Sequence, residues 1–279
     1  MATHEFGAIG THWAIEILSL QEFSAALITE LHATADRFDQ RYSRFRDDSL
    51  IAELARTGEL ISPPEEFVLM MDFAKEIYNV SRGAFNIGVG ATLHRLGYGQ
   101  RQHGHSIRKS IWDEISYSSD RITVPKGEML DFGGFGKGWL IELFVADMRS
   151  AGITEFIVNG GGDLYCQSVE PIEFKMEDPY DASVQFGQTR IAQGALAVSN
   201  TIKRAWSDGE KIKHHIIDPE TDDSSQSGVV ASFVRADSAL IADTVATILI
   251  VRPELEDELK AHYNLKTILV RDYQPKISL

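Results

Sequence analysis

The sequence lacks the features on which small secreted proteins and nucleic-acid-binding proteins depend. Its 279 residues include a single cysteine, Cys166, so no internal disulfide can form and nothing in the chain calls for an oxidising compartment. Basic residues are scarce relative to acidic ones, since 27 Lys and Arg face 41 Asp and Glu for a net charge of −14. An acidic surface repels phosphate backbones and anionic lipid, so we expect no nucleic-acid partner.

Long hydrophobic runs are also missing. The longest, residues 239–251, is too short to span a bilayer and contains Asp243, so we expect no membrane segment. The start of the chain has neither a basic region nor an apolar stretch, because polar residues such as Glu5 and Glu16 interrupt it. We therefore expect the chain as it stands to be cytoplasmic, and a leader removed beforehand would leave no trace in it.

What is present is the composition of a globular protein. Hydrophobic residues make up 43% of the chain and charged residues 24%, which are ordinary values for a soluble folded protein. A chain of this length can bury about 70% of its surface on folding, so it needs no disulfide or metal for support. We expect one domain over residues 1–279, in which two subdomains share a central cleft.

Apolar spacing predicts helices and short strands in irregular alternation. Residues 19–22 form a capping box before apolar residues at helical spacing up to Phe38, and residues 62–65 repeat this start signal for a helix that ends near Gly83. Further helices are expected at 138–151, at 238–251 and from Pro253, and strands at 121–124, 154–158, 174–176, 195–199, 213–217, 229–235 and 266–271. Runs of strands without strict β-α-β alternation predict an α+β fold with mixed sheets and packed helices.

Two glycine-rich segments are candidates for ligand binding. Residues 130–138 (LDFGGFGKG) precede a predicted helix, where exposed N–H groups together with Lys137 would form a phosphate site. The spacing is not that of a Walker A motif, and a glycine-rich turn with a solvated lysine explains it equally well. Residues 158–163 (VNGGGD) follow a predicted strand and would either cradle a ligand or turn a corner.

Asp243 and Thr247 are a candidate metal site. They lie four residues apart on a predicted helix, so both side chains project from one face of an otherwise apolar segment. A hard cation such as Mg²⁺ would compensate the cost of burying the carboxylate. The alternative is structural, with Asp243 paired to a buried arginine and Thr247 bonded back to its own helix.

The segment 213–221 (KHHIIDPET) carries a candidate general base. Alternation along a strand would point His214 and His215 to opposite sides, so at most one of them faces a given cleft. Histidine suits proton transfer near neutral pH. A structural histidine in front of an ordinary Asp-Pro turn is the competing interpretation.

The order and spacing of these segments resemble the ApbE-type family, the FAD:protein FMN transferases. The resemblance covers nearly the whole chain and rests on eight ordered blocks. These blocks are 9–17 (IGTHWAIEI), 41–54 (RYSRFRDDSLIAEL), 82–99 (RGAFNIGVGATLHRLGYG), 130–139 (LDFGGFGKGW), 158–163 (VNGGGD), 195–200 (ALAVSN), 215–221 (HIIDPET) and 238–247 (SALIADTVAT).

The resemblance implies an ApbE-like flavin-transferase domain that uses Mg²⁺ and FAD. Such an enzyme moves FMN through a phosphoester onto a threonine or serine of an acceptor flavoprotein and releases AMP. The matching positions imply that FAD is bound by Phe45, Ala84, Phe85, Asn86, Asp131, Lys137 and Ser199, that the metal is held by the Gly136 carbonyl, Asp243 and Thr247, and that catalysis depends on Asp243 and on His215 as the base.

Some positions depart from the family pattern. Ile9 replaces the usual methionine, residues 198–200 read Val-Ser-Asn in place of Thr-Ser-Gly, Asn86 replaces an aspartate and Asp222 a glycine. Two other functions therefore stay open. One is an FAD pyrophosphatase, in which water replaces the acceptor hydroxyl, and the other is a non-catalytic flavin-binding protein.

Overall fold

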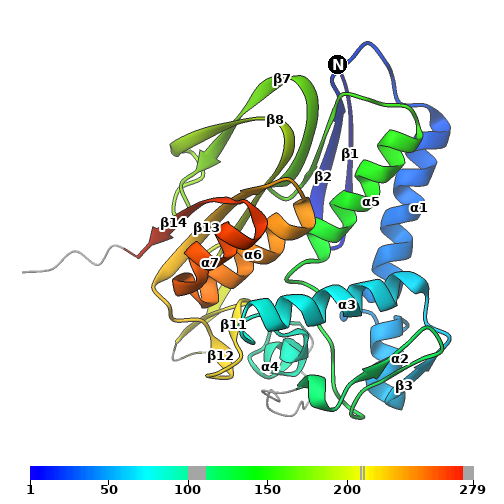
Figure 1. Cartoon of the computed structure of the whole chain (residues 1–279), viewed down its shortest axis with the longest axis vertical. Helices are drawn as coiled ribbons and strands as arrows, with labels where there is room; N and C mark the ends of the chain where they lie inside the picture. Colours follow the sequence, from blue (N-terminus) through cyan, green and yellow to red (C-terminus); the bar gives the residue numbers. More distant parts are fainter. Residues whose placement is uncertain (100–110, 208, 210, 273–279) are drawn as a thin grey trace, which may run out of the picture.

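A seven-stranded antiparallel sheet forms the centre of the fold (Figure 1). The computed structural model describes residues 1–99, 111–207, 209 and 211–272. The strand order is β1-β2-β6-β7-β8-β13-β14, and each neighbouring pair is antiparallel. The strands are β1 (Ala2–Ala8), β2 (Thr11–Ile17), β6 (Phe156–Gly160), β7 (Asp163–Glu177), β8 (Gln185–Asn200), β13 (Val229–Ala236) and β14 (Lys266–Arg271).

Three small sheets lie outside the central one. One has the order β3-β5-β4, and the other two are the hairpin-like pairs β9–β10 and β11–β12. Their bounds are β3 (Glu59–Ile61), β4 (Ser116–Tyr117), β5 (Arg121–Thr123), β9 (Ala205–Ser207), β10 (Ile212–His214), β11 (Ile217–Asp218) and β12 (Asp223–Ser224).

Helices cover the sheet and complete the core. The α-helices are α1 (Ala25–Tyr42), α2 (Leu50–Thr57), α3 (Glu65–Val80), α4 (Gly90–Arg95), α5 (Gly136–Ser150), α6 (Ala239–Val251) and α7 (Glu256–Tyr263), with 3₁₀ turns at η1 (Ile87–Val89), η2 (Ile111–Asp113) and η3 (Pro253–Leu255). Helix α6 packs on β8 and β13, and α5 packs between α6 and α1. Other elements cover α6 on most sides, and its side chains are accordingly apolar around nearly the whole helix.

The first turns of α5 and α6 meet at Gly138. A Cβ atom on this glycine would lie 2.6 Å from the Ala239 carbonyl oxygen and 2.8 Å from the Leu240 Cα. No other residue fits there without moving one of the two helices. The close approach also lets the Gly138 N–H donate to the carboxylate of Asp243, at 2.9 Å.

The start of α1 differs from the sequence-based expectation. The helix begins at Ala25 and is capped by Ser24, whose hydroxyl accepts from the Leu27 N–H, so the predicted capping box at residues 19–22 is wrong. Leu20 is fully exposed instead of facing the core. At α3 the predicted start is correct, but Pro64 takes the N-cap position and no side chain caps the helix.

The predicted strand at residues 213–217 is also wrong in its extent. Strand β10 ends at His214 and β11 begins at Ile217, so residues 215 and 216 connect two separate small sheets. Strands β7 and β8 are much longer than the short pieces expected at residues 174–176 and 195–199.

The expected α+β class is confirmed. Most of the buried apolar side chains form one cluster that extends from Trp13 on β2 to Leu265 before β14. The division into two subdomains stays a prediction. Across residues 1–99, 111–207, 209 and 211–272, no helix is long and apolar enough to cross a membrane.

We predict that Gly138→Ala destabilises the protein by roughly 1–3 kcal/mol, because the new methyl group forces α5 and α6 apart. Urea denaturation followed by circular dichroism measures this. Gly7→Ala on β1 is the matched control, since a Cβ at Gly7 meets no atom within 4 Å. Equal stability of the two variants would show that the helix contact is not tight.

Candidate active site

All the predicted site residues line one cavity of about 670 Å³. It opens between the end of α1, the loop before α5, the end of β8, the segment after β10 and the side of α6. The candidates on its wall are Phe45, Ala84, Phe85, Asn86, Asp131, Gly136, Lys137, Ser199, His215, Asp243 and Thr247. Side chains from distant parts of the sequence therefore converge on one space.

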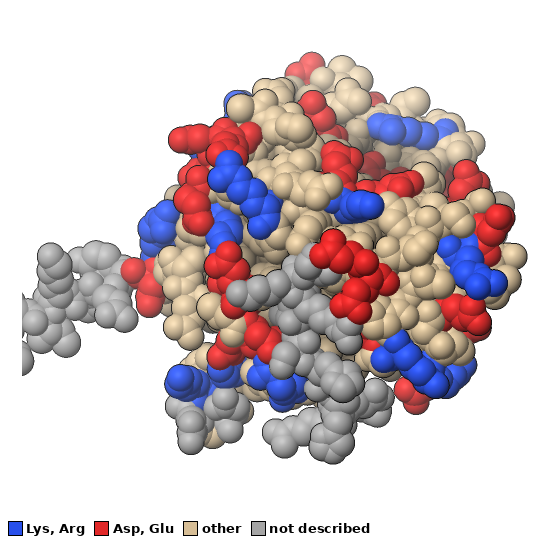
Figure 2. Space-filling model, turned by 60° about the horizontal axis from the view of Figure 1, so that its bottom comes forward, with Lys and Arg blue, Asp and Glu red and all other residues tan. Residues whose placement is uncertain are grey.

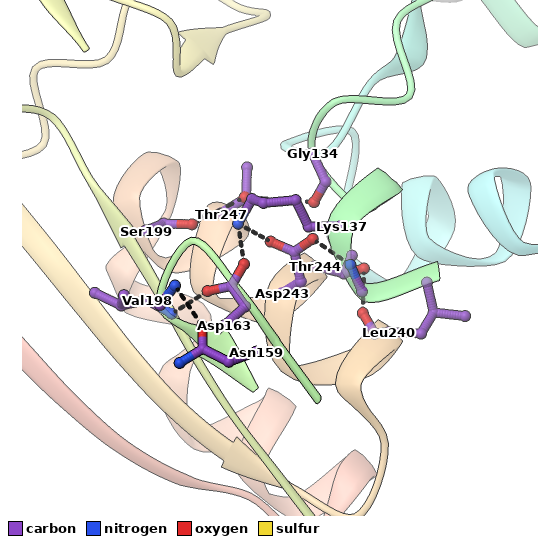
Figure 3. Close-up of polar contacts among 12 residues, drawn as sticks. Gly134, Lys137, Asn159, Asp163, Val198, Ser199, Leu240, Asp243, Thr244 and Thr247 are labelled. Atoms are coloured by element: carbon purple, nitrogen blue, oxygen red, sulfur yellow. Dashed lines mark hydrogen bonds and ion pairs between the residues drawn. The ribbon is translucent and has the colours of Figure 1, made fainter. Parts of the chain in front are cut away.

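Lys137 lies between two buried carboxylates in this cavity (Figure 3). Its Nζ contacts Asp163, the first residue of the long strand β7, and lies 3.3 Å from Oδ1 of Asp243 on α6. Both aspartates are 2% exposed. Asp243 thus pairs with a lysine, and not with the buried arginine that the structural alternative requires. One ammonium faces two carboxylates, so the cluster keeps a net negative charge.

Thr247 lies one helical turn beyond Asp243 and turns away from its own helix. Its hydroxyl lies 3.1 Å from Oγ of Ser199 and 3.4 Å from the carbonyl oxygen of Gly134 (Figure 3). Thr244, by contrast, bonds back to the Leu240 carbonyl at 2.7 Å. The Thr247 hydroxyl is therefore directed toward the loop before α5.

The donors around Asp243 suit a hard cation. They are a carboxylate, hydroxyls and a backbone carbonyl, which are the oxygen ligands that Mg²⁺ accepts. The carbonyl next to Thr247 belongs to Gly134, whereas the family resemblance pointed to Gly136, the first residue of α5. Within the described part of the chain, no group of three or more His, Cys, Asp or Glu side chains is arranged to hold a metal. A metal here would rely on hydroxyl, carbonyl and phosphate oxygens besides Asp243.

Asp131 is held by the protein itself. Its Oδ1 accepts from the Gly133 N–H at 2.5 Å, and its Oδ2 lies 2.5 Å from Nε of Arg44. Arg44 and Asp131 are 7% and 9% exposed. In this structure Asp131 therefore forms an ion pair with Arg44. Its carboxylate oxygens could contact FAD directly only while they also bind Arg44 and the Gly133 N–H.

Arg44 in turn supports an aromatic wall. Its guanidinium lies 4.1 Å from the ring centroid of Phe45 and donates to the Tyr98 carbonyl at 3.2 Å. Tyr98 stacks on Trp206 with a centroid distance of 5.3 Å. Phe45 is 59% exposed at the cavity, so its face is open to a planar ligand.

The segment 84–86 forms another side of the cavity. Ala84 and Phe85 are buried, and a Cβ on Gly134 would lie 2.6 Å from the Phe85 ring, so this wall is tightly packed. Asn86 caps η1 by accepting from the Gly88 N–H at 2.8 Å. Its Nδ2 is buried and has no hydrogen-bond partner among the described residues.

His215 lines the cavity as a neutral imidazole. Burial lowers its pKa from 6.5 to about 3, and the positive charges of Arg204 and Lys137 act in the same direction. Its Nδ1 has no hydrogen-bond partner among the described residues. The ring is therefore neutral at neutral pH. A pKa this far below 7 makes it a weak base, and an anionic phosphate bound beside it would raise that pKa toward the range of a general base.

His214 has a different role from its neighbour. Its Nε2 lies 2.9 Å from the Ser225 carbonyl and its Nδ1 accepts from the Ile216 N–H at 3.3 Å. His214 does not line the cavity, so the two side chains do separate. Alternation along a strand is not the reason, because β10 ends at His214.

Two further contacts fix the segment that carries His215. Arg252, at the end of α6, forms two 3.0 Å hydrogen bonds with the carboxylate of Asp218. Ser225 donates to the Ile250 carbonyl at 2.9 Å. The segment with the candidate base is thereby attached to the helix that carries Asp243 and Thr247.

The charged residues of this site that sequence reasoning missed include Arg44, Asp163 and Arg204. Asp163 closes the glycine segment 158–163, and that position after three glycines was the available signal. Arg44 and Arg204 carry no local signal, because their importance comes from partners that are distant in the sequence. On the face shown in Figure 2, acidic and basic side chains alternate in small groups, with no single extended basic area.

The fold is α+β, and its cavity is lined by aromatic, cationic and acidic side chains. A family model described as the ApbE family matches residues 9–268. The chain belongs to this family. Its strands and helices follow solved members: Flavin Transferase ApbE from Vibrio cholerae superposes with a TM-score of 0.82 at 19% identity, over 98% of this chain and 94% of that one.

Other relatives agree with this assignment. The ApbE protein from Thermotoga maritima has a TM-score of 0.81 at 19% identity, with 96% and 94% of the two chains covered. An FAD:protein FMN transferase of Rhodobacter capsulatus is 33% identical over 224 residues, and one of Klebsiella pneumoniae (strain 342) is 23% identical over 225 residues. The match covers 74% of this chain in both cases, but only 42% of the Rhodobacter protein and 69% of the Klebsiella protein.

We predict that His215 contributes to acid sensitivity of the fold. Because its pKa is about 3 in the folded state and about 6.5 when unfolded, the unfolded chain binds the extra proton between these values. Stability should therefore fall as the pH drops below about 6.5, by up to about 2 kcal/mol at pH 5 from this group.

Urea denaturation at pH 7 and pH 5 tests this expectation. His215→Gln should lose less stability between the two pH values than the wild type does. His262→Gln, which changes an exposed histidine on α7, is the control and should behave like the wild type. An equal loss in all three proteins would contradict a buried neutral His215.

Proposed function

We propose that this protein is a Mg²⁺-dependent transferase that moves FMN from FAD onto a threonine or serine hydroxyl of an acceptor flavoprotein and releases AMP. The observation that carries the proposal is the meeting of Lys137, Asp243 and His215 in one cavity. These residues supply a cation, an oxygen ligand for a metal and a neutral base. Membership of the ApbE family and the names of its relatives support the same reaction.

The cavity offers separate surfaces for the two parts of FAD. The exposed ring of Phe45 and the buried pair Ala84 and Phe85 provide apolar contact for the isoalloxazine ring. The N-terminus of α5 with Lys137 faces the same cavity and attracts the diphosphate. Asn86 adds a buried donor without a partner in the described chain, which suits a carbonyl or ring nitrogen of the flavin.

Asp243, Thr247 and a carbonyl of the loop before α5 would hold the Mg²⁺, with Ser199 close to Thr247. When bound, the ion neutralises charge that develops on the phosphate oxygens. Lys137 orients both aspartates, since it contacts Asp163 and Asp243 together.

The transfer step uses His215 as the base. The acceptor hydroxyl oxygen forms a bond to the phosphorus of the FMN half, and its proton passes to the neutral imidazole of His215. The bond from that phosphorus to the oxygen of the AMP half breaks, and AMP leaves with the electron pair. In the alternative reaction, water takes the place of the hydroxyl and the products are FMN and AMP.

The test incubates the protein with FAD and Mg²⁺, with and without a co-expressed flavoprotein encoded by a neighbouring gene. We expect AMP release that depends on the acceptor, together with a mass increase of the acceptor that corresponds to FMN. Asp243→Asn should abolish both, because it removes the charged oxygen ligand. AMP release at the same rate without acceptor would identify a pyrophosphatase, and no AMP at all would leave only flavin binding.

We further predict that His215→Ala binds FAD normally but transfers FMN about 10²–10⁴-fold more slowly, as expected for a lost general base. Transfer rates at saturating FAD, together with FAD affinity measured by flavin fluorescence, separate the two effects. His262→Ala is a better control than His214→Ala, because His214 is buried and bonded to Ser225 and Ile216. A weaker FAD affinity with an unchanged saturated rate would remove His215 from the role of base.

A further inference from the structure

The cationic side chains of the cavity differ in whether they form an ion pair with a carboxylate of the protein. Among the described residues, five Lys or Arg side chains line the cavity: Arg44, Arg46, Lys137, Lys203 and Arg204. The first four are paired, Arg44 with Asp131, Arg46 with Asp39 and Asp48, Lys137 with Asp163 and Asp243, and Lys203 with Glu177.

Arg204 has no such partner within residues 1–99, 111–207, 209 and 211–272. Its guanidinium donates a long hydrogen bond, 3.5 Å from Nη1 to the Tyr98 hydroxyl. A chain with a net charge of −14 has many carboxylates available, yet within the part of the chain that the structure describes this arginine lines the cavity without one. Its positive charge is therefore free to meet an anionic ligand.

The position of Arg204 places this charge beside the candidate base. The residue lies between β8 and β9 and lines the same cavity as His215, whose pKa its positive charge helps to lower. Its side chain reaches Tyr98, whose ring centroid lies 5.8 Å from that of His215. Lys137 reaches the same cavity from α5, so the two cations approach from different elements.

When a diphosphate and a divalent metal ion are bound next to the Lys137 cluster, one more positive charge is needed to make the sum of these charges zero. Lys137 with Asp163 and Asp243 leaves one negative charge. A divalent metal ion turns this into one positive charge, and the diphosphate of a dinucleotide brings two negative charges. Counted over the Lys137 cluster, the metal ion and the diphosphate alone, one negative charge remains, and Arg204, which has no carboxylate partner in the described part of the chain, can cancel it.

We propose that Arg204 is a specificity-determining residue that binds phosphate oxygens of the dinucleotide substrate on the His215 side of the cavity. This inference rests on the proposed function, because it assumes that the cavity takes FAD. The guanidinium can present two parallel N–H groups to a phosphate, which a lysine cannot do. A ligand with a diphosphate is then favoured over one that has only the flavin ring.

The experiment compares the affinities of riboflavin, FMN, ADP and FAD in the presence of Mg²⁺. Calorimetry or flavin fluorescence gives the dissociation constants for the wild type, Arg204→Gln and Arg204→Lys. For Arg204→Gln we expect ADP and FAD to bind at least about 10-fold more weakly, the effect of one lost hydrogen bond to a charged group, and riboflavin to bind within twofold of wild type. Arg204→Lys should restore part of the loss.

Arg190→Gln is the matched control. It removes one positive charge from β8 at an exposed position that does not line the cavity, so it should leave all four affinities unchanged. A similar loss in this variant would mean that net charge alone matters. An equal loss for riboflavin and ADP in Arg204→Gln would mean that Arg204 only supports the Tyr98 wall, and unchanged ADP and FAD binding would overturn the proposal.

FMN transfer tests the proposed function, whereas ADP affinity tests the role of Arg204, so the two can fail independently. A wild type that binds ADP more tightly than Arg204→Gln does, but never transfers FMN, keeps the phosphate assignment and loses the transferase. A wild type that transfers FMN, with Arg204→Gln equal to it in ADP affinity, keeps the transferase and loses the assignment. A wild type that binds neither ADP nor FAD overturns both.

Discussion

The contact of one ammonium group with two buried carboxylates holds the centre of this protein together. Lys137 comes from α5, Asp163 from the first position of β7, and Asp243 from α6 (Figure 3). Asp163 also accepts from the Val198 N–H on β8 at 2.8 Å. Removing Lys137 from this cluster would leave two buried carboxylates without their cation, which costs several kcal/mol as a rule. Two helices and two strands therefore depend on the same ionic contact.

The sequence allowed much of the fold to be predicted wherever an apolar stripe had a clear boundary. Helix α6 and strand β14 lie where their patterns indicated, and the α+β class is correct. The β1–β2 hairpin was not predicted, because its first strand alternates between exposed and half-buried positions and contributes little to the core. The start of α1 was misplaced because two serines compete as caps, and only packing of the following residues selects Ser24.

The candidate site could be predicted as a set of residues but not as a set of contacts. The glycine segments, His215 and the pair Asp243 and Thr247 carry recognisable local patterns, and the cavity brings them together. Partners such as Arg44 with Asp131, or Lys137 with Asp163, are joined only by the folded chain. Local spacing contains no information about which distant charge balances a given side chain. For this reason only the folded chain shows that Arg204 has no carboxylate partner among the described residues.

The attachment of the His215 segment to the end of α6 has a consequence for motion. The bonds from Arg252 to Asp218 and from Ser225 to Ile250 connect this segment to α6, a helix whose residues are mostly apolar and buried. A fluctuation that frees the segment must break a bidentate ion pair or loosen the helix itself. Backbone amides of residues 214–218 should then exchange with solvent deuterium together with those of α6, as one cooperative opening unit. An opening that displaces the candidate base would thus also displace the candidate metal ligands on α6.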